Sequence, residues 1–486
     1  MTLGDWLAGA WGVVVAVTTL GGAILASGHA ILYKRDTRAT VLWVSFIWLA
    51  PVAGAVCYLL LGINRIKRRA VLLRSTGPRR DRADLERLRA QEPRQMPPVV
   101  VVRPELGRLV RLVEHVVHAP LQAGNRIEPR FDGDEAYPDM IAAIEAAESS
   151  VGQCTYIFDR DPTGLRFVEA LRRAVRRGVQ VRVLVDDTGA RYSFPTIVTV
   201  LRRADVPVAR FLPTLAPFRT LALNMRCHRK LLLADGRIAF TGGMNIRAGH
   251  ETAADGSIQI RDTHFRVEGP VVAQLRDVFA DDWLFTTGEA LEGPRWFPAL
   301  AEAGDAHARV VADGPDENLD RLRWTLLGAL SSAASRVCIA TPYFLPDGSL
   351  ISALNTAALR GVSVEILLPA TNNLPYVQWA STAHLWQVLE CGCRVFMVPG
   401  PFDHSKVMIV DGAWSFFGSS NWDPRSLRLN FELDLECYSQ HLARDLTAWF
   451  ERRRETAREV TLAEVNGRSL PVRLRDGVAR LATPFL

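Results

Sequence analysis

Lysine is nearly absent from this 486-residue chain: 58 residues are lysine or arginine, and only four of them are lysines. The seven cysteines form no CxxC pair and no zinc-like spacing, so we interpret them as small core residues of a reducing compartment. HExxH, carboxylate-cluster and Gly-x-x-x-x-Gly-Lys patterns are also missing, so we predict no metal, nucleotide or other cofactor. The net charge of +6 is spread without an aromatic-interleaved basic run, which argues against nucleic-acid binding.

Charged residues are missing from two long apolar runs, residues 6–33 and 39–64. Each run is long enough to cross a hydrocarbon core of about 30 Å at about 1.5 Å per residue. We therefore predict a membrane anchor of two transmembrane helices over residues 1–64. A cleaved signal peptide followed by a buried core helix is the alternative, but the first run lacks a basic n-region and exceeds a typical h-region.

A block rich in arginine follows the second run, and we assign residues 65–98 to a basic linker. Positive residues stay cytoplasmic, so the rest of the chain is expected on that side, with the block facing anionic headgroups. The alternative is a merely solvated linker. If both runs span, Lys34, Arg35 and Arg38 would lie on the far side, so a hairpin that enters the membrane and returns also stays open.

The same pattern occurs twice, from His228 to Asn245 and from His404 to Asn421. In each copy a lysine follows the histidine by two residues, an aspartate comes five further on, a glycine seven beyond that and the asparagine three later. Lys230 and Lys406 are thus two of the four lysines in a chain that otherwise uses arginine. A compact ammonium is not interchangeable with a guanidinium, so these positions are predicted to need lysine.

Each motif lies in a similar succession of predicted elements. Strands over 154–158 and 179–185 flank a helix in the first half, and strands over 337–344 and 361–368 flank one in the second. Strand, helix and strand joined by short turns indicate parallel crossover units. We therefore predict two copies of one α/β unit, residues 99–295 and 296–486, with the boundary in a Gly-, Pro- and Glu-rich segment.

The paired motifs suit attack on a phosphodiester. Alternation along a strand sends each histidine and its lysine to the same face. One imidazole can attack phosphorus while the other, protonated, donates to the leaving alkoxide. The two lysines would hold the non-bridging oxygens, together with the Asn245 and Asn421 amides and the small Ser419.

A catalytic histidine also needs a group that orients its other ring nitrogen, usually a carboxylate. Asp262 lies downstream of the first motif and Glu432 downstream of the second, and we take them as the orienting candidates rather than surface carboxylates. Asp235 and Asp411 belong to the motifs and are counted with the catalytic set, although their place before a glycine indicates a turn. The remaining histidines are expected on the surface or in the core, with a site role left open for two of them, His250 and His264.

The paired His-x-Lys-x4-Asp motif resembles that of the phospholipase D superfamily, and the flanking strings resemble its bacterial cardiolipin synthases. The strings are Asn125, Asp132 to Tyr137, Tyr156 to Phe158, Asn224 to Lys230, Arg261 to Gly269, Thr341 to Phe344 and Asn421 to Glu432. The sequence departs from the family pattern at Ile246 to His250 and just before His404, both where the headgroup pocket is expected.

The resemblance implies two phospholipase D-like α/β domains about a pseudo-twofold axis, preceded by the two-helix anchor, with one site between them and no metal. It implies transfer of a phosphatidyl group from one phosphatidylglycerol to another with release of glycerol, through a phosphohistidine on His228 with His404 as the acid. The implied location is the bacterial inner membrane, as a multi-pass protein with cytoplasmic catalytic domains among anionic lipids; the oligomeric state stays open. Two alternatives are a phospholipase D-type phosphodiesterase that uses water and a non-catalytic membrane scaffold, against which the intact histidines and lysines argue.

Overall fold

The computed structural model describes residues 3–34, 37–62, 97, 103–213, 225–315 and 318–483. These residues belong to two compact units, an N-terminal helical unit and an α/β unit that holds the described residues from 103 onwards. The basic linker predicted for residues 65–98 lies outside the described residues except for Pro97.

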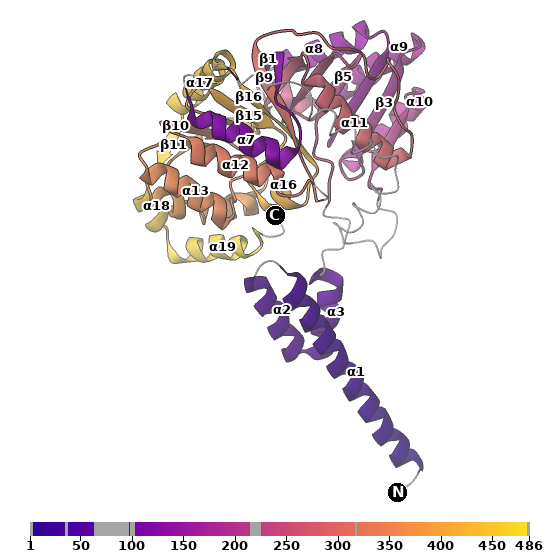
Figure 1. Ribbon diagram of the computed structural model, residues 1–486, viewed down its shortest axis with the longest axis vertical. Helices are drawn as coiled ribbons and strands as arrows, with labels where there is room; N and C mark the ends of the chain where they lie inside the picture. The colour runs from indigo at the N-terminus through magenta and orange to yellow at the C-terminus, as the bar shows by residue number, and fades with distance from the viewer. Residues whose placement is uncertain are drawn as a thin grey trace. The chain divides into compact units, whose positions relative to one another are not determined.

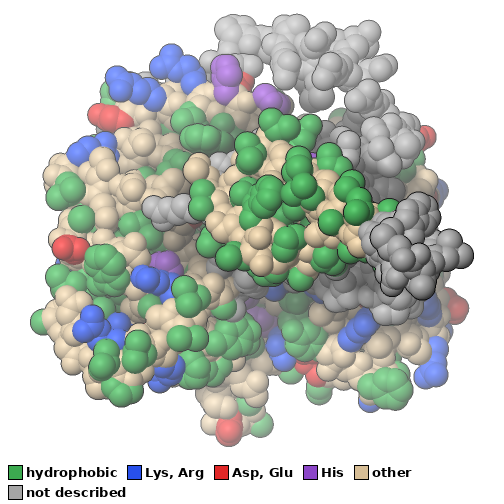
Figure 2. All heavy atoms as spheres, turned by 90° about the horizontal axis from the view of Figure 1, so that it is seen from below, with side chains coloured by type: hydrophobic (Ala, Val, Ile, Leu, Met, Phe, Trp, Pro, Cys, Tyr) green, Lys and Arg blue, Asp and Glu red, His purple; other side chains and the backbone are tan. Residues whose placement is uncertain are grey.

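The N-terminal unit is built on one long helix, α1 (Leu3–Tyr33). Residues Trp11–Tyr33 of α1 are long and apolar enough to cross a membrane. Three shorter elements follow, α2 (Thr37–Leu49), α3 (Pro51–Cys57) and the π-helical turn η1 (Tyr58–Gly62). Ile47 and Tyr58 from these elements pack against small residues of α1, so the elements lie along α1 (Figure 1). Most large side chains of these helices are apolar and exposed, which gives the unit the hydrophobic surface seen in Figure 2.

The second predicted membrane helix differs from the structure. Residues 39–64 do not form one helix, because α2 ends at Leu49 and Pro51 opens α3. Proline lacks the N–H that would continue the α2 ladder, and its ring clashes with the preceding turn. A side chain at Gly54 would lie 2.6 Å from the Ile47 Cα, so α3 folds back closely on α2. With 13 residues, α2 spans about 20 Å, less than a hydrocarbon core. Among the described helices one is long enough to span a membrane and the second apolar run forms a helical hairpin, so the second span stays a prediction.

The α/β unit contains one mixed sheet of 15 strands among its described residues. Its strand order is β17-β12-β11-β10-β14-β15-β16-β9-β1-β8-β6-β5-β2-β3-β4. The first-half strands are β1 (Gln122–Phe131), β2 (Ser150–Thr155), β3 (Gln180–Asp186), β4 (Val208–Phe211), β5 (Leu231–Ala234), β6 (Ile238–Gly242), β7 (Ile260–Arg261) and β8 (Thr263–Glu268). The second-half strands are β9 (Ala306–Asp313), β10 (Arg336–Ala340), β11 (Ser363–Pro369), β12 (Arg394–Val398), β13 (Phe402–Asp403), β14 (Val407–Val410), β15 (Trp414–Gly418), β16 (Glu432–Tyr438) and β17 (Arg458–Val460).

The strand order repeats about the centre of the sheet, where β9 pairs with β1. Outward from that pair, β8-β6-β5-β2-β3-β4 on one side matches β16-β15-β14-β10-β11-β12 on the other. The last three strands of each series are parallel and the others antiparallel. The predicted pair of α/β repeats is therefore confirmed, and the two repeats share one continuous sheet (Figure 1).

Helices cover both faces of this sheet. The first half has α7 (Glu105–Val117), α8 (Asp132–Ala146), α9 (Pro162–Arg176), α10 (Ile197–Arg203) and α11 (Val272–Thr287). The second half has α12 (Arg321–Ser332), α13 (Gly348–Leu359), α14 (Pro375–Thr382), α15 (Trp386–Leu389), α16 (Pro424–Arg428), α17 (Gln440–Glu455), α18 (Leu462–Asn466) and α19 (Leu470–Leu481). One apolar core, which contains α11 and α17, joins the repeats. Each repeat has a second core under its outer helices, and α7 packs into that of the second repeat. The predicted boundary at 295/296 falls between α11 and β9.

Each motif forms the predicted hairpin, β5 with β6 and β14 with β15. The turns use Asp235-Gly236 and Asp411-Gly412, all four with φ between +51° and +63°. Positive φ at both central residues is the geometry of the tight turn whose twist matches that of a β-hairpin. The hairpins bring the two histidines to the middle of the sheet, where the repeats meet.

Candidate active site

Short backbone pairings tie each histidine to the opposite repeat. The His228 N–H donates to the Phe431 carbonyl at 2.9 Å, and the His404 N–H donates to the Arg261 carbonyl at 2.7 Å. Cys227 and Phe431 form an isolated parallel β-bridge, and β13 pairs in parallel with β7. The residues just before each histidine therefore lie beside the residues just before the other repeat's orienting carboxylate.

The histidine and carboxylate pairs cross between the repeats. His228 Nδ1 lies 2.9 Å from Glu432 Oε2, and His404 Nδ1 lies 2.8 Å from Asp262 Oδ2. Both carboxylates are fully buried and both histidines are 9% exposed. A carboxylate on Nδ1 fixes that nitrogen as the donor and leaves Nε2 for chemistry. The structure thus brings together the two predicted orienting carboxylates and the two histidines, each carboxylate serving the motif of the other repeat.

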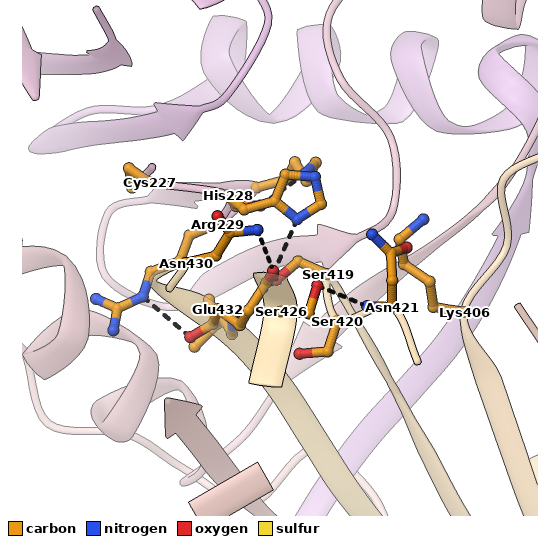
Figure 3. Close-up of polar contacts among 12 residues, drawn as sticks. Cys227, His228, Arg229, Lys406, Ser419, Ser420, Asn421, Ser426, Asn430 and Glu432 are labelled. Atoms are coloured by element: carbon orange, nitrogen blue, oxygen red, sulfur yellow. Dashed lines mark hydrogen bonds and ion pairs between the residues drawn. The ribbon is translucent and has the colours of Figure 1, made fainter. Parts of the chain in front are cut away.

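The two carboxylates have different surroundings. Glu432 accepts from Ser419 Oγ at 2.5 Å and from Asn430 Nδ2 at 3.0 Å, besides its contact with His228 (Figure 3). Burial alone would raise its pKa, but the contacts with His228, Lys230 and Ser419 outweigh burial and lower the pKa to about 2. Burial raises the pKa of Asp262 to about 6, against the opposing charge of Lys406. Glu432 is therefore the more firmly ionised of the two partners.

Gly243 occupies the place in the first motif that Ser419 has in the second. A Cβ at Gly243 would lie 2.2 Å from Asp262 Oδ1, so no side chain fits there in this arrangement. The Thr263 N–H, at 2.8 Å, is the donor to that oxygen. This exchange of serine for glycine accounts for part of the difference between the two carboxylates.

Both motif lysines are buried beside the histidines. Lys230 Nζ donates to the His228 carbonyl at 2.6 Å, and Lys406 Nζ donates to the His404 carbonyl at 2.5 Å. Burial lowers the pKa of Lys230 to about 7 and that of Lys406 to about 8, although Glu432 and Asp262 oppose the shift. Burial also lowers the pKa of His228 to about 4 and that of His404 well below its usual range. When no phosphodiester is bound, the neutral form of both the His228 and the His404 imidazole is therefore favoured.

The three residues predicted to bind phosphate separate into two kinds. Asn245 and Asn421 line the same pocket as the histidines. Asn245 Oδ1 accepts from the Ile157 N–H, whereas Asn421 Oδ1 is buried without a hydrogen-bond partner among the described residues. Ser419 is fully buried, and its hydroxyl donates to Glu432 and accepts from the Leu433 N–H. Ser419 is therefore corrected from a phosphate ligand to a residue that positions Glu432.

The motif aspartates do not reach the imidazoles. Asp235 accepts the N–H groups of Glu148, Ser149 and Ser150, which lead into β2. Asp411 accepts those of Ala334, Ser335 and Arg336, which lead into β10. Their inclusion in the catalytic set is corrected, because their carboxylates tie the hairpin turns to neighbouring strands, as their place before a glycine indicates.

The two histidines left open also differ. His250 lines the pocket, whereas His264 is buried behind the site. Burial lowers the pKa of each to about 3, which keeps them neutral. Neither is in a pair with a carboxylate like those of His228 and His404.

Several pocket residues were not named as site residues from the sequence, although they lie in stretches that were quoted for the family resemblance or for departure from it. The pocket has a volume of about 290 Å³ and is also lined by Tyr156, Tyr343, Arg226, Asn430 and Phe402. The Tyr156 and Tyr343 rings lie edge-on to His228 and His404, with centroids 5.4 Å and 6.3 Å apart. Arg226, Phe402 and Asn430 each lie two residues before a motif histidine or an orienting carboxylate, and this shared spacing would have identified them from the sequence. Among the described residues, no group of three or more His, Cys, Asp or Glu side chains could hold a metal ion.

Comparison with known proteins places this site in a family. The family model described as "Cardiolipin synthase, PLD-like domain" matches residues 140–283 and 326–454, one segment in each repeat. The chain is a member of the cardiolipin synthase family. A second model, "Phospholipase_D-nuclease N-terminal", matches residues 21–62, which hold the end of α1 and the hairpin.

Similar proteins agree over the whole length. A cardiolipin synthase of Geobacillus kaustophilus is 30% identical, over 100% of this chain and 96% of its own. One of Listeria monocytogenes is 28% identical over 97% of this chain and 99% of its own. The crystal structure of phosphatidylserine synthase from Haemophilus influenzae has a TM-score of 0.63 at 16% identity, over 78% of this chain and all of its own, which supports the fold. The phospholipase D superfamily and a phosphatidyltransferase activity, both implied by the sequence resemblance, are confirmed.

Proposed function

We propose that this member of the family joins two phosphatidylglycerol molecules into cardiolipin and glycerol, through a phosphatidyl group carried on His228. The observation that carries the proposal is the pair of crossed histidine and carboxylate contacts, with two buried lysines beside them around one pocket. Such a set supplies a nucleophile, an acid and fixed positive charge without a diffusible cofactor.

The assignment of His228 as nucleophile follows from its partner. Attachment of phosphorus to Nε2 makes the imidazole cationic, and an ionised carboxylate on Nδ1 stabilises that charge. Glu432, with donors from Ser419 and Asn430, is the carboxylate held most firmly in its ionised form. His404 faces Asp262, whose pKa of about 6 lets that pair take up and release a proton.

In the first step His228 Nε2 forms a bond to phosphorus, and the bond from phosphorus to the glycerol oxygen breaks. His404 gives its proton to that oxygen, and glycerol leaves. The bound phosphodiester supplies the negative charge that favours a protonated His404 between the two lysines. Asn421 and Asn245 line the pocket in which the reacting lipid would bind, where their amide N–H groups can donate to phosphate oxygens.

In the second step the free hydroxyl of another phosphatidylglycerol attacks phosphorus. Its proton goes to His404, the bond from phosphorus to His228 breaks, and cardiolipin leaves with both histidines restored. One phosphodiester replaces another, so the exchange needs no nucleotide. A chain with a span-length apolar helix would meet both lipids in one membrane, and we place its catalytic unit on the cytoplasmic side of a bacterial inner membrane.

The proposal is tested with the purified full-length chain in phosphatidylglycerol vesicles, with lipid products resolved by mass and His404→Ala beside it. We expect cardiolipin and glycerol in equal amounts, and a loss of about 10²- to 10⁴-fold in the variant, the range for a missing general acid. Phosphatidic acid in place of cardiolipin would contradict synthesis and indicate hydrolysis.

A further inference from the structure

The two repeats differ at the residues that flank the histidines. Arg226 precedes His228 by two residues, and Phe402 precedes His404 by two. The same spacing before the orienting carboxylates gives Asn430 for Glu432 and Ile260 for Asp262. All four side chains line the pocket, so the symmetry of the backbone is broken in its walls.

Backbone pairing puts these residues together in twos. Phe402 is in register with Ile260 in the short pairing of β13 and β7. In the equivalent place Cys227 bridges Phe431, and the Phe431 N–H donates to the Arg226 carbonyl at 2.8 Å. One wall therefore carries arginine and asparagine, and the wall related to it by pseudosymmetry carries phenylalanine and isoleucine.

The Arg226 guanidinium is buried, and the counter-charge that the described residues offer it is distant. The residue is 7% exposed, its Nη1 donates to the Met225 carbonyl, and its Nε lies 4.0 Å from Asp186 Oδ1. The two oxygens of Asp186 already accept from the Thr188 and Cys227 N–H groups. A buried charge that is incompletely paired is costly, and a guanidinium binds phosphate through two parallel hydrogen bonds. Arg226 is thus suited to an anion that enters the pocket.

We propose that Arg226, with Asn430 beside it, binds the phosphate of the second phosphatidylglycerol, the lipid that accepts the phosphatidyl group. This inference rests on the proposed function, in which both substrates are phosphodiesters. The two motif lysines bind the reacting phosphate. The acceptor's own phosphate is three carbons from its attacking hydroxyl and needs a second cation. Phe402 and Ile260 offer no such partner on the other wall. Water and glycerol carry no phosphate, so the subsite favours a phospholipid acceptor over either.

The acceptor step can be separated from the first step with full-length enzyme in phosphatidylglycerol vesicles. Exchange of labelled glycerol into the lipid reports formation of the intermediate and its return with a neutral acceptor, whereas cardiolipin reports transfer to a second phospholipid. In Arg226→Gln we expect cardiolipin formation to fall by about 10- to 100-fold, the range for a lost charge-assisted contact. Glycerol exchange should stay within about twofold of wild type, since it needs no second phosphate. Arg226→Lys, which keeps the charge, should recover part of the loss.

Arg247→Gln is the matched control. Arg247 lines the same pocket, but its Nε lies 3.1 Å from Asp159, so its charge is already paired. We expect cardiolipin formation in this variant to exceed that of Arg226→Gln. An equal loss in the two variants, or a parallel loss of exchange and transfer in Arg226→Gln, would overturn the subsite.

The wild-type arm separates this inference from the proposed function. A wild-type chain that forms no cardiolipin overturns the proposed function. A wild-type chain that forms cardiolipin, with an Arg226→Gln variant that forms as much, overturns only the subsite.

Discussion

At the scale of single residues, the two histidines share a backbone plan and differ in what surrounds their carboxylates. Glu432 receives two side-chain donors besides His228, whereas Asp262 faces a glycine where the other motif has serine. In the proposed mechanism this difference would give chemically distinct roles to groups related by pseudosymmetry, because one imidazole attacks while the other donates a proton.

Ser419→Ala tests this role of the Glu432 environment. Loss of the hydroxyl donor raises the Glu432 pKa and weakens the hold on His228, so we expect kcat to fall about tenfold, equivalent to one hydrogen bond to a charged group. Ser415→Ala is the matched control, because Ser415 is buried in β15, the strand that leads to Ser419, and its hydroxyl has no hydrogen-bond partner among the described residues. Equal activity of the two variants would contradict a positioning role for Ser419.

The motif lysines predict the pH dependence. The pKa values of about 7 and 8 for Lys230 and Lys406 lie below the usual lysine value because the side chains are buried. The charged form holds phosphate and exists below the pKa, so kcat/KM should fall as the pH rises through 7 to 8. Initial rates in vesicles over this range measure it. A rate that rises or stays constant across the range would show that the lysines are not needed in the charged form.

At the scale of secondary-structure elements, the hairpins position the motif histidines and lysines, and the motif aspartates bind the hairpin turns to neighbouring strands. Asp411 accepts three backbone N–H groups at the start of β10. For Asp411→Ala we expect a loss of about 1 to 3 kcal/mol in the free energy of unfolding, the cost of leaving such donors unpaired. The activity of the folded fraction should be retained. Denaturant unfolding and the specific activity of the folded enzyme are the measurements, and unchanged stability with abolished activity would return Asp411 to the catalytic set.

Gly243→Ala tests the tight contact between Gly243, just after β6, and Asp262, between β7 and β8. The added methyl group would lie 2.2 Å from Asp262 Oδ1 and must displace the carboxylate that orients His404. We expect activity to fall by at least about tenfold, since geometry at reacting groups is exacting. Gly477→Ala, in helix α19 with open space around the new methyl group, should keep full activity. Full activity in Gly243→Ala would mean that the carboxylate can move without cost.

The sequence predicted the elements that depend on local pattern. The hairpins followed from apolar strands on either side of Asp-Gly, and the repeats from the recurrence of His228 to Asn245 at His404 to Asn421. The sequence identified Asp262 and Glu432 as orienting carboxylates, but it did not show that each contacts the histidine of the other repeat. That crossed pairing depends on the long-range contacts of Cys227 with Phe431 and of β13 with β7. Ser419 was predicted to bind phosphate and Arg226 was given no site role, because the contacts of both are with residues distant in the sequence.

At the scale of the whole molecule, Pro51 interrupts the second apolar run of the N-terminal segment. A break after Leu49 divides the second apolar run into a hairpin beside α1, so the number of spans stays a prediction that the helix lengths do not decide. If α1 alone crosses the membrane, Thr37 at the start of α2 lies on the same side as the catalytic unit. Two spans would put Thr37 on the opposite side.

Cysteine labelling distinguishes these topologies. Cys57 and Cys391, the two partly exposed native thiols, are replaced by alanine, and Thr37→Cys and Ser257→Cys are introduced separately. Ser257 is exposed on the catalytic unit. We expect an impermeant thiol reagent to label neither site in intact cells and both in inverted membrane vesicles. Labelling of Thr37→Cys in intact cells, with Ser257→Cys protected, would support two spans.

In the proposed reaction the phosphatidyl group passes through His228 with His404 as the acid. The most direct measurement is the mass of protein quenched during turnover of phosphatidylglycerol, in wild type and in His404→Gln, followed by peptide mapping. We predict a phosphatidyl adduct on His228, whose Nδ1 is held by Glu432 and whose Nε2 is left for phosphorus. An adduct on His404, or cardiolipin formation by a His228→Ala variant, would contradict the account.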